Sequence, residues 1–313
     1  MRMCRLGQTG LEIAPLVLGG NVFGWTTDRE TSFAILDAFV DAGFNAIDTA
    51  DVYNRYAPGL EGGESERMIG DWMHERGNRD RVILITKGGL AMGEGLEGLG
   101  RDYLSRVCEA SLRRLRTDWI DVYLAHAPDP ATPIAETLEA FDGLIGRGLI
   151  RHAGCSNFSA DQLREALAAS GEGRARMAVV QPRYNLAERG DYEGPLEDLC
   201  AAQGLGVITY YALAAGFLTG KYRGEADLAG SARSRVVSTL LNPRGLALLG
   251  RIDDVAARHR ASPAQVALAW IMARPSVAAP IASATSVRQL AEISAAVSLT
   301  LSGEDMATLD FAG

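Results

Sequence analysis

Residues 44–53 read FNAIDTADVY, and this stretch predicts how the rest of the chain is arranged. The apolar run at residues 44–47 is typical of the end of a buried strand. Asp48 follows it directly, although a core strand does not normally end in a carboxylate that lacks a partner. We therefore expect a cation from elsewhere in the chain beside Asp48, and we expect Tyr53 in the loop that follows the strand.

The same order of elements repeats along the chain. A short apolar run ends in a polar loop, and a segment of helical length with apolar residues on one face follows. Continuous apolar runs are typical of parallel strands that helices cover. The predicted strands are residues 16–20, 44–47, 82–87, 120–126, 150–155, 177–181, 206–210 and 278–283.

Caps and breakers predict where the helices begin and end. Asp28 is a typical N-cap, Gly43 a typical stop, and Pro133 a typical residue near a helix start. The predicted helices are residues 29–42, 64–77, 101–115, 133–148, a segment up to 169, a segment ending near 204, then 246–259, 263–273, 287–297 and 304–309.

Eight strand–helix units predict an α/β fold, a single (β/α)8 TIM barrel that spans residues 1–313 as one domain. A β-hairpin at residues 6–15 precedes the barrel, and an extra helix follows the seventh strand. Two doubly wound domains are the alternative fold, but they would usually be joined by a linker that this sequence lacks. The glycine-rich loop at residues 93–100 does not open a helix in the GxGxxG manner.

Composition limits the partners and the location. The formal net charge of -8 comes without basic clusters, which argues against a nucleic-acid or anionic-membrane partner. The four cysteines are scattered, which fits a reducing compartment and gives no zinc-binding spacing. An apolar signal core and a run of membrane-spanning length are both lacking in the sequence. We expect a cytoplasmic protein without a metal site; the oligomeric state is not predicted.

Polar residues occur where the predicted strands end. In a parallel barrel these ends meet on one rim, where the active site lies. Residues far apart in the sequence are therefore expected to converge there. They are Asp48, Lys87, His126, Ser156, Asn157, Gln181, Tyr210 and Ser283.

Four residues of this rim suggest a reaction. Asp48 and Lys87 would each be costly to bury alone, but they can neutralise each other. A nearby ammonium is expected to lower the pKa of a Tyr53 hydroxyl from about 10, which suits a proton donor at neutral pH. His126 adds a hydrogen-bond donor for a carbonyl oxygen. Together they suggest reduction of a carbonyl group or its reverse, whereas a metal-dependent barrel hydrolase has only one histidine at a strand end.

Each residue also has a structural interpretation. Asp48 and Lys87 are also explained as a structural ion pair, and His126 as a satisfied core histidine. Tyr53 and Tyr210 are also explained as aromatic packing. Local sequence favours a helix N-cap at Asn157. Their joint placement on one rim is the reason to prefer a functional site.

The residues quoted above resemble those of the aldo-keto reductases, over essentially the whole chain. The combination of these stretches is specific for the family, whereas no single stretch is. The matching stretches are GFNAIDTADVY at 43–53, ILITKGG at 83–89, IDVYLAHAPDP at 120–130, GLIRHAGCSNFS at 148–159, VVQPRYN at 179–185 and GVITYYALAAGFLTGKY at 206–222.

This resemblance implies metal-free hydride transfer between NADP(H) and a small carbonyl or alcohol substrate, with NAD(H) as the alternative cofactor. It implies a catalytic tetrad of Asp48, Tyr53, Lys87 and His126. The cofactor contacts that it implies are Ser156, Asn157 and Gln181 at the carboxamide, Tyr210 on the nicotinamide ring, Leu213, Gly216, Leu218 and Lys221 at the pyrophosphate, and Ser283, Thr285, Arg288, Gln289 and Glu292 at the adenosine end.

The adenosine stretch departs from the common family pattern at Ser283, Gln289 and Ile293, which affects the choice between NADPH and NADH. Two groups of residues favour the 2′-phosphate of NADPH. One is the start of the helix after the eighth strand, with Arg288 in its first turn. The other is a basic run in the loop after the seventh strand, which includes Arg233.

Trp25, Tyr56 and Pro128 are candidates for the walls of the substrate pocket, because loops on this rim surround the reacting carbon. Packing of loop on loop is their alternative interpretation. Some members of the resembled family serve channel partners. A cofactor-binding regulatory subunit with slow turnover is therefore the alternative function.

Overall fold

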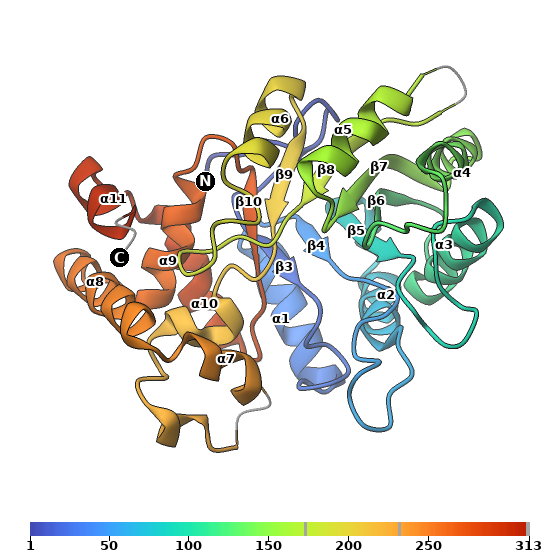
Figure 1. The fold of residues 1–313 in the computed structure, drawn as a ribbon. Helices are drawn as coiled ribbons and strands as arrows, with labels where there is room; N and C mark the ends of the chain where they lie inside the picture. The colour runs from blue at the N-terminus through green and yellow to red at the C-terminus, as the bar shows by residue number, and fades with distance from the viewer. Residues whose placement is uncertain (172–173, 231–232, 311–313) are drawn as a thin grey trace.

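The strands form one closed barrel in the computed structural model, which describes residues 1–171, 174–230 and 233–310. Figure 1 shows the helices arranged around the ring of strands, whose order is β10-β3-β4-β5-β6-β7-β8-β9. This parallel ring confirms the predicted (β/α)8 TIM barrel. Its strands are β3 (Val17–Gly19), β4 (Ala46–Asp48), β5 (Ile83–Gly88), β6 (Ile120–Ala125), β7 (Ile150–Ser156), β8 (Met177–Gln181), β9 (Gly206–Thr209) and β10 (Ala279–Ala282).

Most helices begin and end at the local signals that predict them. The Asp28 side chain accepts a hydrogen bond from the Thr31 amide as the N-cap of α1, and Gly77 ends α2 with a φ of 61°. The helices are α1 (Arg29–Asp41), α2 (Glu64–Arg76), α3 (Arg101–Leu115), α4 (Ile134–Gly146), α5 (Ala160–Ala169), α6 (Pro195–Gln203), α7 (Ser234–Leu240), α8 (Pro243–His259), α9 (Pro263–Met272), α10 (Val287–Ser294) and α11 (Gly303–Asp310).

The segment after β9 holds more structure than the sequence predicts. The expected extra helix is present as α8, which begins at Pro243 rather than at residue 246. The helix α7 precedes it and was expected to be loop. Two 3-10 segments, Ala214–Thr219 and Glu225–Leu228, also lie in this part of the chain. Short helices without a long apolar period leave little signal for a prediction.

The N-terminal hairpin covers the barrel at the end opposite the predicted active-site rim. Its strands are β1 (Cys4–Arg5) and β2 (Glu12–Ile13), so it begins before residue 6 and ends before residue 15. Gly7 has a φ of 57°, and a Cβ atom there would lie 2.2 Å from the Gly206 nitrogen. Only glycine fits this close approach between the hairpin and the start of β9.

Apolar side chains fill both sides of the ring of strands. Trp72, Phe39 and Trp270 lie fully buried among the residues between the strands and the helices. The barrel interior is also packed, so it is not a channel and any site is limited to its ends. Within the described residues, no helix is both long and apolar enough to span a membrane. The interior residues are Leu6, Ile13, Val17, Ala46, Ile85, Val122, Leu124, Val179, Ile208, Ala279 and Ile281.

Candidate active site

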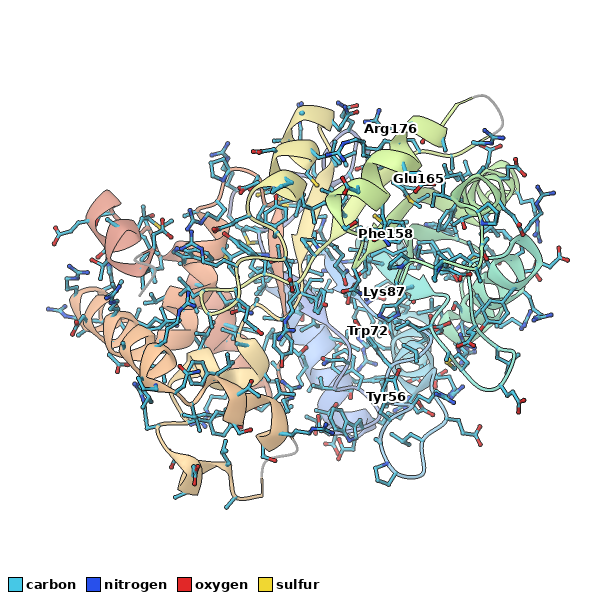
Figure 2. All side chains as sticks on the ribbon, in the orientation of Figure 1. Tyr56, Trp72, Lys87, Phe158, Glu165 and Arg176 are labelled. Carbon is cyan, nitrogen blue, oxygen red and sulfur yellow. The ribbon has the colours of Figure 1, made fainter. Side chains whose placement is uncertain are left out.

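The carboxyl ends of the strands bring the predicted polar residues to one rim. Asp48 is the last residue of β4, Lys87 is the second-to-last residue of β5, and Gln181 is the last residue of β8. His126 follows β6 and Tyr210 follows β9. Figure 2 shows Lys87 near the centre of the ring of strands, whereas Tyr56 lies farther out among the loops. The strand positions alone therefore explain why residues distant in sequence converge.

Lys87 is the cation expected beside Asp48. Its Nζ atom lies 2.8 Å from both carboxylate oxygens of Asp48 and 2.8 Å from the Thr49 carbonyl oxygen. Both side chains are almost completely buried, at 1% and 2% exposure. Burial lowers the pKa of Lys87, and the Asp48 charge opposes that shift. The pair is thus a desolvated ion pair whose charges are balanced locally.

Tyr53 completes a hydrogen-bonded triad with this pair. Its hydroxyl donates to Asp48 Oδ2 at 3.1 Å and accepts from Lys87 Nζ at 2.9 Å. The expectation that Lys87 lowers the Tyr53 pKa is wrong for this state, because burial and the Asp48 charge raise that pKa well above its usual value. The positive charge of Lys87 is already balanced by Asp48. Tyr53 is therefore a neutral hydroxyl that holds its proton.

His126 lies beside Tyr53 as a neutral imidazole. The two rings meet edge to face with their centroids 6.1 Å apart. Burial, aided by the Lys87 charge, lowers the pKa of His126 to about 3. Its Nδ1 atom is buried without a hydrogen-bond partner in the part of the chain that the structure describes. A buried N–H group without a partner is rarer in proteins than a buried acceptor without one. We therefore assign the imidazole proton to Nε2 and leave Nδ1 as the acceptor without a partner.

Asn157 does not cap a helix, contrary to the interpretation that local sequence favours. The N-cap of α5 is Ser159, which forms a capping box with Gln162. Asn157 instead has a φ of 62°, and its Nδ2 atom donates to the His126 carbonyl oxygen at 2.8 Å. The Tyr210 hydroxyl donates to Asn157 Oδ1 at 2.7 Å. Asn157 thus joins the segments after β6, β7 and β9.

Ser156 and Gln181 are paired in the register of β7 and β8. Ser156 Oγ donates to the Gln181 carbonyl oxygen at 2.9 Å. The side-chain amide of Gln181 points toward the tetrad, and its Nε2 atom donates to Asp48 Oδ1 at 2.7 Å. Sequence reasoning missed this contact, since nothing local to either residue indicates it.

The loop from Leu213 to Lys221 follows Tyr210 at the rim. Consecutive residues here have positive φ, including Ala214, Ala215 and Gly216, at 48°, 55° and 91°. The amides of Ala214 and Gly216 donate within the loop, to the carbonyl oxygens of Tyr211 and Leu213, so the backbone turns tightly here. The Lys221 ammonium lies over the Tyr222 ring at 4.8 Å. Leu218 is fully buried, and its amide donates to the Leu213 carbonyl oxygen at 3.3 Å.

The segment after β10 is held by its own side chains. Ser283 Oγ donates to Asn21 Oδ1 at 2.6 Å, a partner that sequence reasoning missed. Gln289 Oε1 accepts from both the amide and the hydroxyl of Thr285, at 2.9 and 2.8 Å. Arg288 is exposed in the first turn of α10.

Two other predicted contacts lie at helix ends rather than in the cluster around Asp48. The Glu292 carbonyl oxygen accepts from Gln265 Nε2 at 3.0 Å. Arg233 is the N-cap residue of α7. Their use in cofactor binding stays a prediction.

The residues predicted to line the substrate pocket do not lie within the tetrad. Trp25 is 40% exposed and Tyr56 is 78% exposed, so the surface interpretation describes both in this state. Pro128 lines a small cavity of about 300 Å³ together with Leu99 and Phe158. These positions leave their role in substrate binding as a prediction.

A second buried charge cluster lies behind the tetrad, and sequence reasoning missed it. Glu66 is fully buried and accepts hydrogen bonds from Arg114 Nε and Thr86 Oγ1, both at 2.6 Å. Asp51 is also fully buried, and among the described residues neither of its carboxylate oxygens has a partner. Burial, with the Glu66 charge, raises the pKa of Asp51 to about 8. Asp51 is therefore a protonated carboxyl group at neutral pH.

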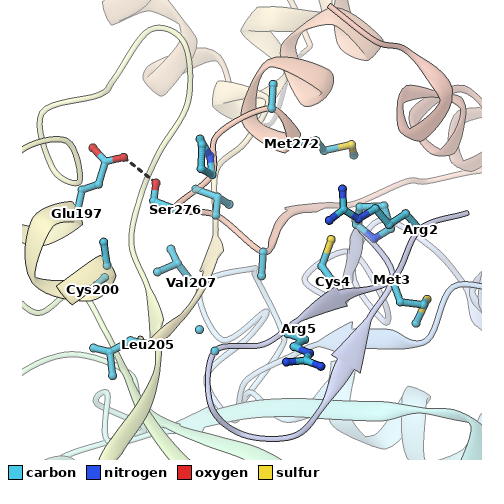
Figure 3. A pocket seen from close by; sticks show the side chains of 18 of the residues that line it. Arg2, Met3, Cys4, Arg5, Glu197, Cys200, Leu205, Val207, Met272 and Ser276 are labelled. Atoms are coloured by element: carbon cyan, nitrogen blue, oxygen red, sulfur yellow. Dashed lines mark hydrogen bonds between the residues drawn. The ribbon is translucent and has the colours of Figure 1, made fainter. Parts of the chain in front are cut away.

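A large cavity of about 1310 Å³ lies at the other end of the barrel, far from these groups in the fold. Hairpin residues and the first residues of β9 line it, including Arg5, Cys4 and Val207 (Figure 3). A hydrogen bond between Ser276 and Glu197 closes one side at 2.6 Å. The volume of this cavity does not make it the candidate active site, because the buried charged side chains lie at the opposite rim.

Comparisons with known proteins agree with this arrangement. The family model described as the Aldo/keto reductase family matches residues 15–312. The chain is 35% identical to the uncharacterized oxidoreductase YrpG of Bacillus subtilis (strain 168), over 99% of this chain and 95% of that protein. It is 32% identical to the aldo-keto reductase YhdN of the same organism, over 97% and 91%. It is 33% identical to a probable voltage-gated potassium channel subunit beta of Oryza sativa subsp. japonica, over 93% and 90%.

The family match and the closed parallel barrel together identify the chain as an oxidoreductase. The chain belongs to the aldo/keto reductase family, as the family match over nearly its whole length shows. Members of this family act on small carbonyl compounds and generally use NAD(P)H. The fold, the family and the oxidoreductase class thus agree with the sequence resemblance.

Proposed function

We propose that this chain reduces an aldehyde or ketone to an alcohol with NADPH, or catalyses the reverse reaction, with Tyr53 as the proton donor. One observation carries the proposal: the Tyr53 hydroxyl bonds to both Lys87 and Asp48 while a neutral His126 lies beside it. This set offers a proton and a second hydrogen-bond donor at one place on the rim. A carbonyl oxygen that gains hydride needs both.

The residues around the triad suit a nicotinamide cofactor. Gln181 Oε1 and Asn157 Oδ1 can accept from the carboxamide amino group, and Tyr210 offers an aromatic face beside them. The loop from Leu213 to Lys221 follows Tyr210 closely along the chain, and we place the pyrophosphate beside it, where Lys221 offers a cation. The cofactor, when bound there, supplies the hydride that is added to the carbonyl carbon.

The side chains of the triad divide the remaining work. Tyr53 Oη turns its proton from Asp48 toward the carbonyl oxygen and transfers it, so that hydride plus proton yields the alcohol. Lys87 keeps its hydrogen bond to Oη and stabilises the phenolate left behind, although the resting hydroxyl has a high pKa. Neutral His126 donates from Nε2 to the carbonyl oxygen. Asp48 balances the Lys87 charge throughout.

Replacement of Tyr53 tests this role. Tyr53→Phe removes one oxygen, so cofactor affinity should persist while kcat falls by about 10² to 10⁴, the usual worth of a positioned acid. Turnover is followed by NADPH absorbance with a panel of aldehydes and ketones. Tyr192→Phe is the matched control, because this buried hydroxyl bonds to the Ser276 carbonyl oxygen outside the site. Near wild-type turnover of Tyr53→Phe would refute the proton-donor role.

A regulatory subunit is the second candidate function, because one relative is named as a probable channel subunit beta. Slow turnover of every tested carbonyl, together with tight cofactor binding, would favour it. The metal-dependent hydrolase has no group of three or more His, Cys, Asp or Glu side chains arranged for a metal among the described residues. Activity that falls on dialysis against a chelator would revive that reading.

A further inference from the structure

Gln181 reaches Asp48 across the mouth of the barrel. In the closed ring, β8 and β4 lie on opposite sides, with β5, β6 and β7 between them one way and β9, β10 and β3 the other. Gln181 and Asp48 each end their strands, and both are 1% exposed. The 2.7 Å hydrogen bond between them therefore spans the barrel interior at the level of the catalytic groups.

This bond completes the set of donors around Asp48. Oδ1 accepts from Gln181 Nε2 and Lys87 Nζ, and Oδ2 accepts from Lys87 Nζ and the Tyr53 hydroxyl. The two oxygens of a carboxylate are chemically equivalent, so these donors fix the orientation of its plane about the Cβ–Cγ bond. Lys87 contacts both oxygens, whereas Gln181 and Tyr53 each contact one, Oδ1 and Oδ2 respectively. Gln181 thus adds a direction that Lys87 alone does not define.

The same bond also orients the amide of Gln181. One N–H of Nε2 is directed at Asp48, which leaves the acceptor Oε1 and the second N–H of this amide for other partners. Ser156, bonded to the Gln181 backbone, holds the strand end that carries this amide. One amide group therefore lies between the proposed cofactor position and the tetrad.

We propose that Gln181 is a positioning residue of the reaction: it holds the Asp48 carboxylate in the orientation that keeps the Lys87–Tyr53 proton donor in place. The inference rests on the proposed function and deepens it. A role in cofactor affinity alone would leave the rate at saturating cofactor and its pH dependence unchanged.

Two variants separate these roles. Gln181→Glu keeps the shape and the Oε1 acceptor but replaces the donor by a carboxyl group facing Asp48. Close contact with a second carboxylate favours the protonated form, so the introduced group should keep its proton well above its ordinary pKa. While protonated it can donate to Asp48 as the amide does. Gln181→Met removes the donor at every pH.

The measurements are kcat at saturating NADPH and the melting temperature, both from pH 5 to pH 8. For Gln181→Glu, we expect kcat near wild type at pH 5 and a loss of about tenfold or more by pH 8 beyond any change in wild type. For Gln181→Met, the loss should be of that size at each pH. The melting temperature of Gln181→Glu should fall relative to wild type as pH rises, because a raised folded-state pKa stabilises only while the proton stays bound.

Asn45→Asp is the matched control, since Asn45 is a half-buried amide at the other end of the barrel that bonds to the Glu12 carbonyl oxygen and the Ala14 amide. It should not change the pH dependence of kcat. If kcat of Gln181→Glu follows wild type at every pH, the positioning role is wrong. A wild type that reduces no carbonyl overturns the proposed function and this role, whereas the melting temperatures still report separately whether Gln181 contacts Asp48.

Discussion

Asp48 receives hydrogen bonds from side chains that reach it from three directions: Lys87 from β5, Tyr53 from the following loop and Gln181 from the opposite strand β8. A carboxylate so surrounded tolerates burial because each lone pair has a partner. The opposite holds for Asp51, whose oxygens are bare within the described residues. Two aspartates of one short stretch are therefore buried in different ways, one among donors and the other, within the described residues, without a partner.

Removal of the cation should expose the cost of burying Asp48. Lys87→Met leaves that carboxylate without its counter-charge, and breaking a buried pair costs about 3–5 kcal/mol of unfolding free energy. It should also change the pH–rate profile, because the phenolate of Tyr53 loses its stabilising ammonium. Thermal melting and kcat against pH measure the two effects.

Arg79→Met is the control for Lys87→Met. Arg79 pairs with buried Asp121 at 2.8 Å, outside the tetrad. It should lower the melting temperature and leave the pH–rate profile alone. An unchanged profile and an unchanged melting temperature for Lys87→Met would contradict the buried pair.

Asp51 should make the fold pH-sensitive. Its pKa is raised to about 8 in the folded state, so the stability of the protonated form is fully present below the unfolded pKa of about 4 and is lost as pH rises toward 8. Asp51→Asn cannot ionise. It should gain in melting temperature relative to wild type between pH 4.5 and pH 8. Asp161→Asn, at an exposed carboxylate of α5, should show no such trend; an equal trend in both would argue against a protonated Asp51.

At the scale of elements, the start of α10 is the proposed position of the adenosine end. We propose that the first amides of this helix and the exposed Arg288 in its first turn bind the 2′-phosphate. One Arg–phosphate pair is worth about 1.5–3 kcal/mol, so NADPH should bind about tenfold or more tightly than NADH. Arg288→Ala should weaken NADPH and barely affect NADH, as measured by titration of Trp fluorescence.

Arg164→Ala on α5 is the control for Arg288→Ala, because Arg164 is an exposed arginine that forms a local ion pair with Asp161. It should leave both affinities unchanged. Equal affinities of wild type for NADPH and NADH would contradict the NADPH preference. A preference that survives in Arg288→Ala would move the phosphate to the basic loop that includes Arg233.

Local patterns predict most of the elements, because an apolar run and a cap act over a few residues. The strand from Met177 to Gln181 matches its predicted range, and α3 from Arg101 to Leu115 does too. The positive φ of Asn157 is not predicted, since its backbone is set by partners on other strands. The bond from Gln181 to Asp48 depends on which strands face each other in the closed ring, and no local pattern contains that information.

At the scale of the whole molecule, ligand binding should be visible as stability. A ligand that binds only the folded state at one hundred times its Kd adds about 2.7 kcal/mol, which corresponds to about 4 °C for a chain of this size. NADPH at that excess should therefore raise the melting temperature, and EDTA should leave it unchanged. A melting temperature that NADPH does not move would contradict the cofactor proposal, and a loss caused by EDTA would indicate a structural metal.

The hairpin has a consequence for how the chain is made. Leu6 and Ile13 are fully buried in a cluster that includes residues of the last strands, β9 and β10, and Gly7 packs against the backbone at Gly206. Those partners are synthesised long after the hairpin has left the ribosome. The two aliphatic side chains of the first segment therefore cannot be fully buried until the final strands have been synthesised. The part of the protein that is translated first is among the last to be buried.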